Sequence, residues 1–404
     1  MPTETKVQIE LARGSEVSVI NLVNSLIEHA HSARASDIHI DPRANSVQVR
    51  IRVDGVLLDS YTFPKELHSP VISRIKVLTS LRTDEHQAAQ DGRFRTSFAD
   101  TLVDIRVSIV PTYYGENAVL RLLSDNASQF SLDAIGFSKP DQEKIMRAAR
   151  RPHGMILSTG PTGSGKTTTL YTLIKLLNRG DNSIITIEDP IEYAVEGVEQ
   201  IQVNTRTGLT FADGLRSILR QDPNIIMVGE IRDTDTASIA VNTALTGHLL
   251  LSTLHTNDAA TTLPRLLDMK IEPFLVASTV NIAIAQRLVR TICTDCKQKK
   301  VFSAPARESL SGTVPPHLLA NVGNVYEGKG CKVCGGTGFK GRTVIGEVLV
   351  VDDEIREVML RKGSASEIKQ IAVKNGMTTI VEEGVRKVIA GDTTFAEILR
   401  VTHE

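Results

Sequence analysis

The sequence predicts a protein of the α/β class, in which an N-terminal α+β domain precedes a larger domain built on a parallel sheet. Up to about residue 125, apolar and polar residues alternate in runs that indicate half-buried strands. From about residue 134, short and nearly continuous apolar runs are separated by segments of helical periodicity. That pattern is typical of a parallel sheet covered on both faces. A chain of 404 residues has room for two or three such domains.

Composition and charge are those of a globular protein. The formal net charge is −1, and aromatic residues make up 4% of the chain. Both values argue against sequence-independent binding of nucleic acid, so no nucleic-acid partner is expected. No run of eighteen apolar residues exists, and the N-terminus lacks the apolar core of a signal peptide. We therefore expect a cytoplasmic protein that would reach a membrane through a partner or a surface patch.

The N-terminal domain is expected to span residues 1–125. Apolar residues at helical spacing between Val19 and Ala30 predict an amphipathic helix. Residues 47–53 and 103–109 alternate Val or Ile with polar side chains, as strands of a mixed or antiparallel sheet do. The polar stretch that follows predicts an interdomain linker at 126–133.

Residues 160–167, GPTGSGKT, fit the phosphate-binding pattern G-x-x-x-x-G-K-[ST]. An apolar run at 155–157 precedes them and helical spacing follows, a context that a surface turn rich in Gly, Ser and Thr would lack. Glycines let backbone N–H groups surround a phosphate at the positive end of the next helix. Lys166 is expected to reach the β and γ phosphates of a nucleoside triphosphate, and Thr167 to bind Mg²⁺. The predicted nucleotide-binding residues are Gly160, Pro161, Thr162, Gly163, Ser164, Gly165, Lys166, Thr167 and Thr168.

Three further apolar runs, at 184–187, 225–228 and 249–251, also end in polar clusters. In open α/β sheets, ligands bind beyond the carboxyl ends of the strands. All these clusters are therefore expected to converge on the nucleotide, in a core that spans 134–290.

Acids and histidines in these clusters are candidates for catalysis. Glu230 is placed as a Walker B acid, able to hold Mg²⁺ through water or to polarise the attacking water. Three acids after another strand compete for that role: Glu188, Asp189 and Glu192. The alternative for acids at such positions is helix capping. His248 and His255 flank the fourth apolar run and could both sense the γ-phosphate, although a lone His is more often a structural hydrogen bonder.

The four cysteines form two C-x₂-C pairs, Cys293 with Cys296 and Cys331 with Cys334. Two such pairs suit a tetrahedral, structural Zn²⁺ with four thiolates, and redox chemistry is the alternative. The long spacing between the pairs predicts an inserted subdomain at 291–340 with a loop-rich middle from Pro305 to Pro316. Residues 341–404 are then expected to return to a strand and continue as a C-terminal helical region.

Several of these stretches together resemble the secretion ATPases of type II secretion and type IV pilus assembly. ITIEDPIE is similar to that family's Asp box, and TGHLLLSTLHTNDA to its His box. The resemblance includes GLTFADGLRSILRQDPNIIMVGEIRD and extends to ASDIHIDP, VRIRVDGVL, QDGRFR and YGENAVLRLL upstream and to GRTVIGEVLVVDDEIREVM downstream. It implies a PAS-like domain ahead of a RecA-like P-loop core, with ATP and Mg²⁺ bound at the subunit contacts of a hexameric ring. It also implies that Glu230 is the catalytic glutamate.

The resemblance further implies that arginines act in trans on the phosphates of a neighbouring subunit. Arg106 and Arg121 match the family's N-terminal-domain arginines by position. Arg216 and Arg220 match a second pair lining the site, and as i and i+4 they share one helix face. Taken alone, each of the four is more often a solvated surface residue. Within the family that this sequence resembles, the tetracysteine element marks the secretion and pilus-extension branches and is lacking in retraction ATPases, so the resemblance disfavours a role in retraction.

The function expected from these features is that of a hexameric, Mg²⁺-dependent motor ATPase. ATP hydrolysis would change the angle between the two domains and work on an inner-membrane platform protein, moving pilin-like subunits. A nucleic-acid translocase and a nucleotide-binding scaffold are the alternatives. Family members usually carry an additional N-terminal domain that docks onto an inner-membrane partner, whereas here the PAS-like domain begins almost at residue 1. A shorter natural form and a chain without its docking domain both fit, so a docking protein as partner is left open.

Overall fold

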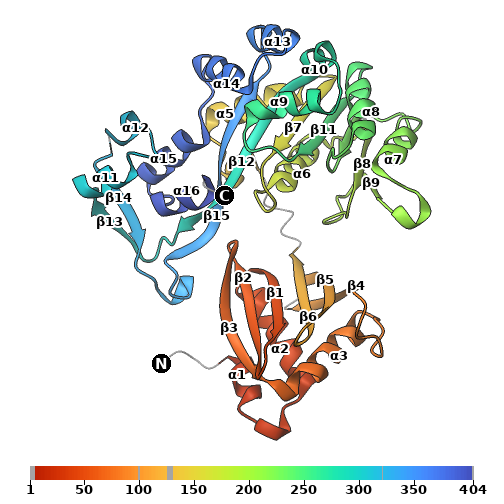
Figure 1. Cartoon of the computed structure of the whole chain (residues 1–404), viewed down its shortest axis with the longest axis vertical. Coiled ribbons are helices and arrows are strands. Elements are labelled where there is room, and N and C mark those ends of the chain that lie inside the picture. The colour runs from red at the N-terminus through yellow and green to blue at the C-terminus, as the bar shows by residue number, and fades with distance from the viewer. Residues whose placement is uncertain (1–4, 99–100, 125–130, 321, 403–404) are drawn as a thin grey trace. The chain divides into compact units, whose positions relative to one another are not determined.

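The computed structural model describes residues 5–98, 101–124, 131–320 and 322–402, and the chain divides into two compact units, 1–128 and 129–404 (Figure 1). Residues 126–130 of the expected linker lie outside the described residues. Ser131 already caps a helix of the second unit, because its hydroxyl accepts a hydrogen bond from the Ala134 amide at 3.0 Å.

The first unit is an antiparallel sheet with helices on one face. Six strands follow the order β3-β2-β1-β6-β5-β4, and every neighbouring pair is antiparallel. The predicted helix and both predicted strands are confirmed, and their apolar positions share one buried core. The main elements are α1 Lys6–Leu11, α2 Val19–Ser32, α3 His68–Leu78, β1 Ala35–Pro42, β2 Ser46–Val53, β3 Val56–Pro64, β4 Gln90–Phe98, β5 Thr101–Thr112 and β6 Gly115–Ser124.

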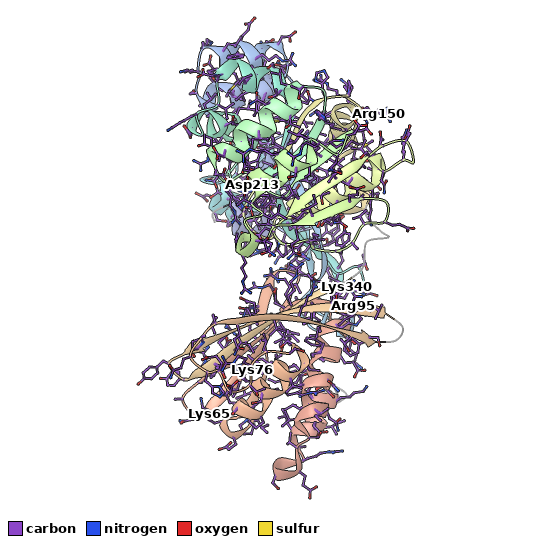
Figure 2. All side chains as sticks on the ribbon, turned by 90° about the vertical axis from the view of Figure 1, so that its right-hand side faces the viewer. Lys65, Lys76, Arg95, Arg150, Asp213 and Lys340 are labelled. Carbon is purple, nitrogen blue, oxygen red and sulfur yellow. The ribbon has the colours of Figure 1, made fainter. Side chains whose placement is uncertain are left out.

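A buried ion pair lies beneath this sheet. Lys76 of α3, labelled in Figure 2, is completely buried, and its Nζ lies 2.6 Å from Oε1 of Glu116 at the start of β6. His86 Nδ1 lies 2.8 Å from the other Glu116 oxygen, so the carboxylate also fixes the segment that leads into β4. Removing one partner of such a pair would leave an uncompensated charge in the core.

The second unit is built on a seven-stranded sheet in the order β15-β12-β7-β11-β10-β8-β9. The pairs from β12 to β9 are parallel, as predicted, and β15 is antiparallel to β12. Met155 and Leu157 face one core cluster and Ile156 another, which confirms that both faces are covered. The strands are β7 Gly154–Thr159, β8 Ile184–Glu188, β9 Glu199–Gln202, β10 Ile225–Val228, β11 Leu249–Leu254, β12 Val280–Ile292 and β15 Phe339–Val350.

Helices cover this sheet, and each described helix is too short or too polar to cross a lipid bilayer. The expected boundaries at 290 and 340 fall inside β12 and at the start of β15, because these two strands pair and extend the core sheet. The helices are α4 Leu132–Ile135, α5 Lys139–Ala149, α6 Lys166–Leu177, α7 Phe211–Ile218, α8 Thr234–Leu245, α9 Ala259–Asp268, α10 Pro273–Thr279, α13 Asp353–Leu360, α14 Ala365–Lys374, α15 Ile380–Ala390 and α16 Phe395–Thr402.

The tetracysteine subdomain is inserted between β12 and β15. It contains the antiparallel strands β13 Lys297–Val301 and β14 Asn324–Gly328 and the helices α11 Ala304–Leu310 and α12 Pro316–Ala320. The predicted loop-rich middle is therefore wrong for the helical residues, and only residues 311–315 between the two helices are turn or coil. Pro305 and Pro316 lie in the first turns of these helices, where a Pro is tolerated because its missing N–H needs no partner.

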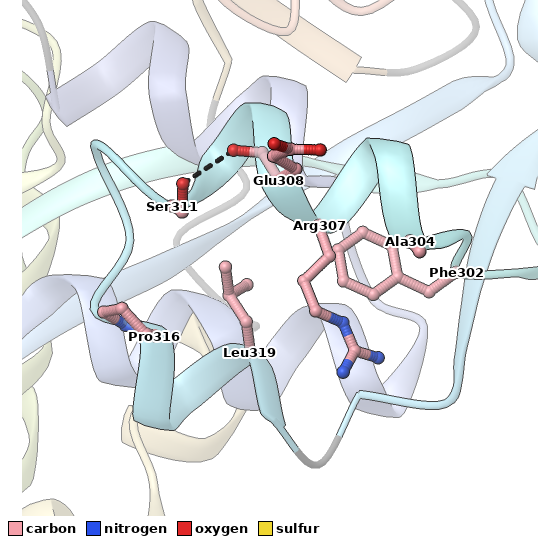
Figure 3. A pocket seen from close by; sticks show the side chains of 7 residues that line it. All are labelled: Phe302, Ala304, Arg307, Glu308, Ser311, Pro316 and Leu319. Atoms are coloured by element: carbon pink, nitrogen blue, oxygen red, sulfur yellow. Dashed lines mark hydrogen bonds between the residues drawn. The ribbon is translucent and has the colours of Figure 1, made fainter.

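The two helices α11 and α12 line a pocket of about 570 Å³ (Figure 3). The Arg307 guanidinium lies over the Phe302 ring, 5.5 Å from its centroid, and Leu319 of α12 is buried nearby. Leu310 and Leu319 pack with Val385 of α15 in one small core. The subdomain is thus attached to the C-terminal helices by apolar contacts.

Candidate active site

The predicted phosphate-binding loop lies between β7 and α6. Gly163 and Gly165 have φ values of 78° and 90°, in the left-handed region that favours Gly. A Cβ on Gly160 would lie 2.6 Å from the carbonyl oxygen of Gln286. The glycines are therefore needed both to turn the loop and to let it pack against β12.

Lys166 is the buried cation of this loop. Its residue is 9% exposed, and its Nζ donates to the carbonyl oxygens of Gly160 (2.8 Å) and Pro161 (3.0 Å). Burial lowers the pKa of Lys166, the Glu230 carboxylate raises it, and the Arg287 guanidinium lowers it further. The Ser164 hydroxyl is also buried and has no hydrogen-bond partner in the described part of the chain. A desolvated ammonium and an unpartnered hydroxyl in a glycine loop fit an anionic phosphate.

Two polar residues of β12, Gln286 and Arg287, stabilise the phosphate loop and its surroundings by hydrogen bonds, and the sequence analysis did not single them out. Gln286 is completely buried, and it accepts from the Thr169 hydroxyl (2.8 Å) and donates to the Ser164 carbonyl (2.9 Å). Arg287 donates to the carbonyl oxygens of Gln286 (3.0 Å) and Asn257 (2.9 Å). The available signal was the pair of polar residues inside the apolar run of 282–289.

Glu230 lies at the carboxyl end of β10, as predicted. The amides on either side of it, Gly229 and Ile231, donate to the carbonyls of Ile187 (2.8 Å) and Thr253 (3.0 Å), which fixes the backbone between β8 and β11. The Glu230 carboxylate is 12% exposed and lies 3.4 Å from Nε2 of His255. The structure thus brings Lys166, Glu230 and His255 to one edge of the sheet.

Arg232 is a further neighbour of Glu230 that the sequence analysis did not single out. Its Nη2 lies 2.6 Å from a Glu230 oxygen. The hydrogen bond with Glu230 is the main cause that raises the pKa of Arg232. The Arg232 guanidinium contacts Oε1 of Glu230, and His255 contacts Oε2. These two contacts together orient the Glu230 carboxylate.

Glu188 is engaged in a different way from Glu230. It is 2% exposed, and it accepts hydrogen bonds from the Tyr171 hydroxyl, from Thr186 Oγ1 (2.6 Å) and from Gln200 Nε2 (3.2 Å). Burial, and then the charge of Glu188, raise the pKa of Tyr171. The Glu192 amide donates to the same Tyr171 hydroxyl at 3.4 Å. Glu188 is thus the acceptor of an internal polar cluster, and the geometry favours Glu230 as the acid that meets water.

The expectation that both histidines lie beside the nucleotide is wrong for His248. Its carbonyl accepts from the amide of Gly154, the first residue of β7, at 3.1 Å, so His248 lies at the amino edge of the sheet. His248 and His255 flank β11 and are seven residue steps apart, which is roughly 23 Å at about 3.3 Å per residue. His248 Nδ1 instead lies 3.2 Å from the Thr243 carbonyl, which makes it a structural hydrogen bonder.

Arg216 and Arg220 are likewise not brought to the phosphate loop of their own chain. Arg216 pairs with Asp213 at 2.9 Å, and Arg220 donates to the Arg216 carbonyl at 2.8 Å. The chain then reaches Asn224, whose amide bonds the Ser183 carbonyl ahead of β8, again at the amino edge. Any action of these arginines on a nucleotide therefore requires a second copy of the chain.

Arg106 and Arg121 are cross-strand neighbours on one face of the sheet of the first unit. They are directly opposite partners in the β5–β6 register, and Arg93 of β4 lies opposite Arg106 on the other side. The Arg121 Nε donates to Asp37 of β1 at 2.9 Å. Cross-strand neighbours of like charge repel each other. Such a row is stabilised by an anion, and Asp37 supplies one at its end.

The four cysteines meet at one place and form no disulfide. The Sγ atoms of Cys293 and Cys331, and those of Cys296 and Cys334, lie 3.9 Å apart, and those of Cys331 and Cys334 lie 3.7 Å apart. Four thiolates about 2.3 Å from a tetrahedral Zn²⁺ would lie ~3.8 Å from one another. The cluster therefore fits zinc.

Backbone amides also support a metal thiolate at Cys334. The amides of Cys331 (3.1 Å) and Gly338 (3.3 Å) donate to its Sγ. Burial raises the pKa of Cys334, but these hydrogen bonds outweigh it and lower the pKa to about 6. Metal binding requires the thiolate form.

Zinc binding by this cluster predicts a measurable loss of stability when the metal is removed. The purified chain is expected to contain one Zn²⁺, and Cys334→Ser should lower the free energy of unfolding by at least ~2 kcal/mol, or about 4–8 °C in Tm. Metal analysis and thermal unfolding test this, with excess Mg²⁺ present when a chelator is used. A metal-free chain with unchanged Tm would contradict the assignment.

Comparison with known proteins settles the family. A family model described as "Type II/IV secretion system protein" matches residues 13–400. The chain belongs to this family. It is 46% identical over 391 residues to the type II secretion system protein E of Xanthomonas campestris, covering 96% of this chain and 68% of that protein. It is also 46% identical to the type IV pilus assembly ATPase PilB of Thermus thermophilus, of which it spans 43%.

Two solved structures share the fold of this chain. The Legionella pneumophila ATPase DotB superposes with a TM-score of 0.68 at 23% identity, covering 94% of this chain and 95% of that one. The pilus retraction motor PilT with bound ADP gives a TM-score of 0.62 at 24% identity, covering 94% and 96%. The expected α/β fold class is confirmed, and family membership makes this chain an ATPase that uses nucleotide and Mg²⁺.

Proposed function

We propose that this ATPase is a homo-hexameric motor that powers type II secretion or type IV pilus assembly through an inner-membrane platform protein. The observation that carries the catalytic part is the grouping of Lys166, Glu230 and His255 at one sheet edge. The two relatives at 46% identity, named for type II secretion and for pilus assembly, support the transport role. The motor would work in the cytoplasm, held at the inner membrane by its protein partners.

Each residue of the site has a role in ATP hydrolysis. Lys166 would bind the β and γ phosphates, while amides of the loop from Gly160 to Thr168 surround them. Thr167 would hold Mg²⁺, which supplies charge neutralisation on the phosphates when bound. Glu230 would accept a proton from the attacking water, with Arg232 and His255 fixing its orientation.

The ring would account for Arg216 and Arg220, which lie toward the amino edge of the sheet and not at the phosphate loop of their own unit. Arg106, Arg121, Arg216 and Arg220 would contact a nucleotide bound by a neighbouring copy. A guanidinium that neutralises the transferring phosphoryl group raises the rate by about 10³–10⁵. Hydrolysis would then change the angle between the two units about residues 129–133. Four cysteines, Cys293, Cys296, Cys331 and Cys334, would hold a structural Zn²⁺ that does not take part in the reaction.

Mixing two inactive variants tests whether the site is shared between copies. Arg121→Ala and Lys166→Ala are each expected to lose turnover, but co-assembled chains should recover it. Roughly a quarter of the contacts in an equal mixture join an intact loop to an intact arginine. Steady-state phosphate release from co-expressed, co-purified chains measures the recovery.

The control is a mixture of Lys166→Ala chains with Glu230→Gln chains. Lys166 and Glu230 belong to the same site of one chain, so every site in this mixture lacks one of the two residues. No recovery in the first mixture, or full turnover by a stable monomer, would overturn the ring. Stimulation of turnover by single-stranded DNA would instead favour a nucleic-acid translocase.

A further inference from the structure

Glu347 of β15 is a buried carboxylate that the catalytic scheme does not use. Its residue is 1% exposed, and burial raises its pKa. Oε1 accepts from the amide of Ala259 (2.8 Å), and Oε2 from the amide of Ile380 (3.4 Å). These are the first residues of α9 and α15, whose amides have no acceptor within their own helices. One side chain thus joins the starts of two helices that are far apart in the sequence.

The α9 end of this connection leads to the phosphate site. The loop 255–258, which carries His255, comes immediately before α9. Thr256 is tied to Thr159, the last residue before the phosphate loop, with their Oγ1 atoms 2.6 Å apart, and the Thr256 amide donates to Thr159 Oγ1 at 2.9 Å. A shift of the loop 255–258 on nucleotide binding would therefore move the first turn of α9.

The other end leads to the tetracysteine subdomain. Helix α15 begins at Ile380, and its Val385 is buried against Leu310 and Leu319 of the inserted helices. The α15 start is itself well capped, because the Thr379 amide donates to Glu382 at 2.8 Å. Because its first turn is capped, α15 would move as a rigid helix, and its apolar contacts would carry that movement to the tetracysteine subdomain.

We infer that Glu347 is a positioning residue that couples the loop 255–258 to α15, and through α15 to the tetracysteine subdomain. A Glu is required because two acceptor oxygens must reach two helix starts, whereas Gln offers one acceptor and an amide that cannot accept. A buried carboxylate is tolerated here because both of its oxygens receive backbone hydrogen bonds at positive helix ends. The inference rests on the ATPase activity of the family and not on the hexameric ring.

Hydrogen exchange of the full chain, with and without the Mg²⁺ complex of a non-hydrolysable ATP analogue, tests the coupling. In the wild type, nucleotide is expected to slow exchange in both 255–263 and 376–384. In Glu347→Gln, the slowing should persist in 255–263 and be lost in 376–384. Turnover should show a lower kcat with an unchanged KM, because nucleotide binding itself is intact.

Glu382→Gln is the matched control, because Gln also serves in a capping box and the residue does not touch α9. It should keep the nucleotide response of 376–384. A second variant, Ala259→Pro, removes the other hydrogen-bonding partner of Glu347 at a position where helices accept Pro, and it should uncouple the two segments in the same way. Absence of a nucleotide response in 376–384 of the wild type would overturn the inference. So would a response there in Glu347→Gln equal to that of the wild type.

Discussion

Replacing Lys166 by Ala is expected to remove nucleotide binding and to lower ATP turnover by at least about 10²-fold, the usual cost of deleting a preorganised group that stabilises developing charge. The fold should survive, because among the described residues the Lys166 ammonium donates hydrogen bonds only to two carbonyls of its own loop, at Gly160 and Pro161. Binding of a fluorescent ATP analogue and phosphate release are the measurements.

Lys175→Ala is the matched control for this change. Lys175 belongs to the last turn of the same helix and lies 5.5 Å from the Tyr193 ring centroid, at the far end from the phosphate loop. Its removal should leave both measurements unchanged. Phosphate release at the wild-type rate by Lys166→Ala would rule out the phosphate loop as the site of hydrolysis.

Glu230→Gln is expected to separate binding from hydrolysis. Gln has the size of Glu and can still accept from Arg232, so the ATP analogue should bind as tightly as in the wild type. The amide cannot take a proton from water, and loss of a general base lowers turnover by about 10²–10⁴-fold. Single-turnover hydrolysis together with equilibrium binding measures both effects.

Glu192→Gln tests the competing acid under the same conditions, and little change is expected. The reverse result, a slow Glu192→Gln and an active Glu230→Gln, would move the base to Glu192. Secretion or pilus assembly that continues in cells carrying only Glu230→Gln would favour the scaffold alternative over a motor.

Local patterns in the sequence were sufficient for much of the site. The glycines around Lys166 and the apolar runs ahead of the loop and of Glu230 each describe a strand and the turn that follows it. Parallel strands place their carboxyl ends at a common edge, so the convergence of these residues could be predicted without coordinates. The two C-x₂-C pairs likewise have the spacing of metal-binding cysteines, so a zinc site could be predicted from the sequence.

His248 shows where that reasoning fails. It and His255 look equivalent as neighbours of one strand, but a strand has two ends and only one of them faces the nucleotide. The helices at Pro305 and Pro316 were missed for a similar reason, since a Pro in a first helical turn gives the same local signal as a loop.

The sequence by itself predicted the glycine loop around Lys166, the strand that ends at Glu230 and the two C-x₂-C pairs, because each of these features depends on residues close together in the chain. Only the tertiary structure decided that Gln286 supports the loop and that Glu347 joins two helix starts. Both depend on the pairing of β12 with β7 and β15, whose register is set by packing between distant segments rather than by either segment alone.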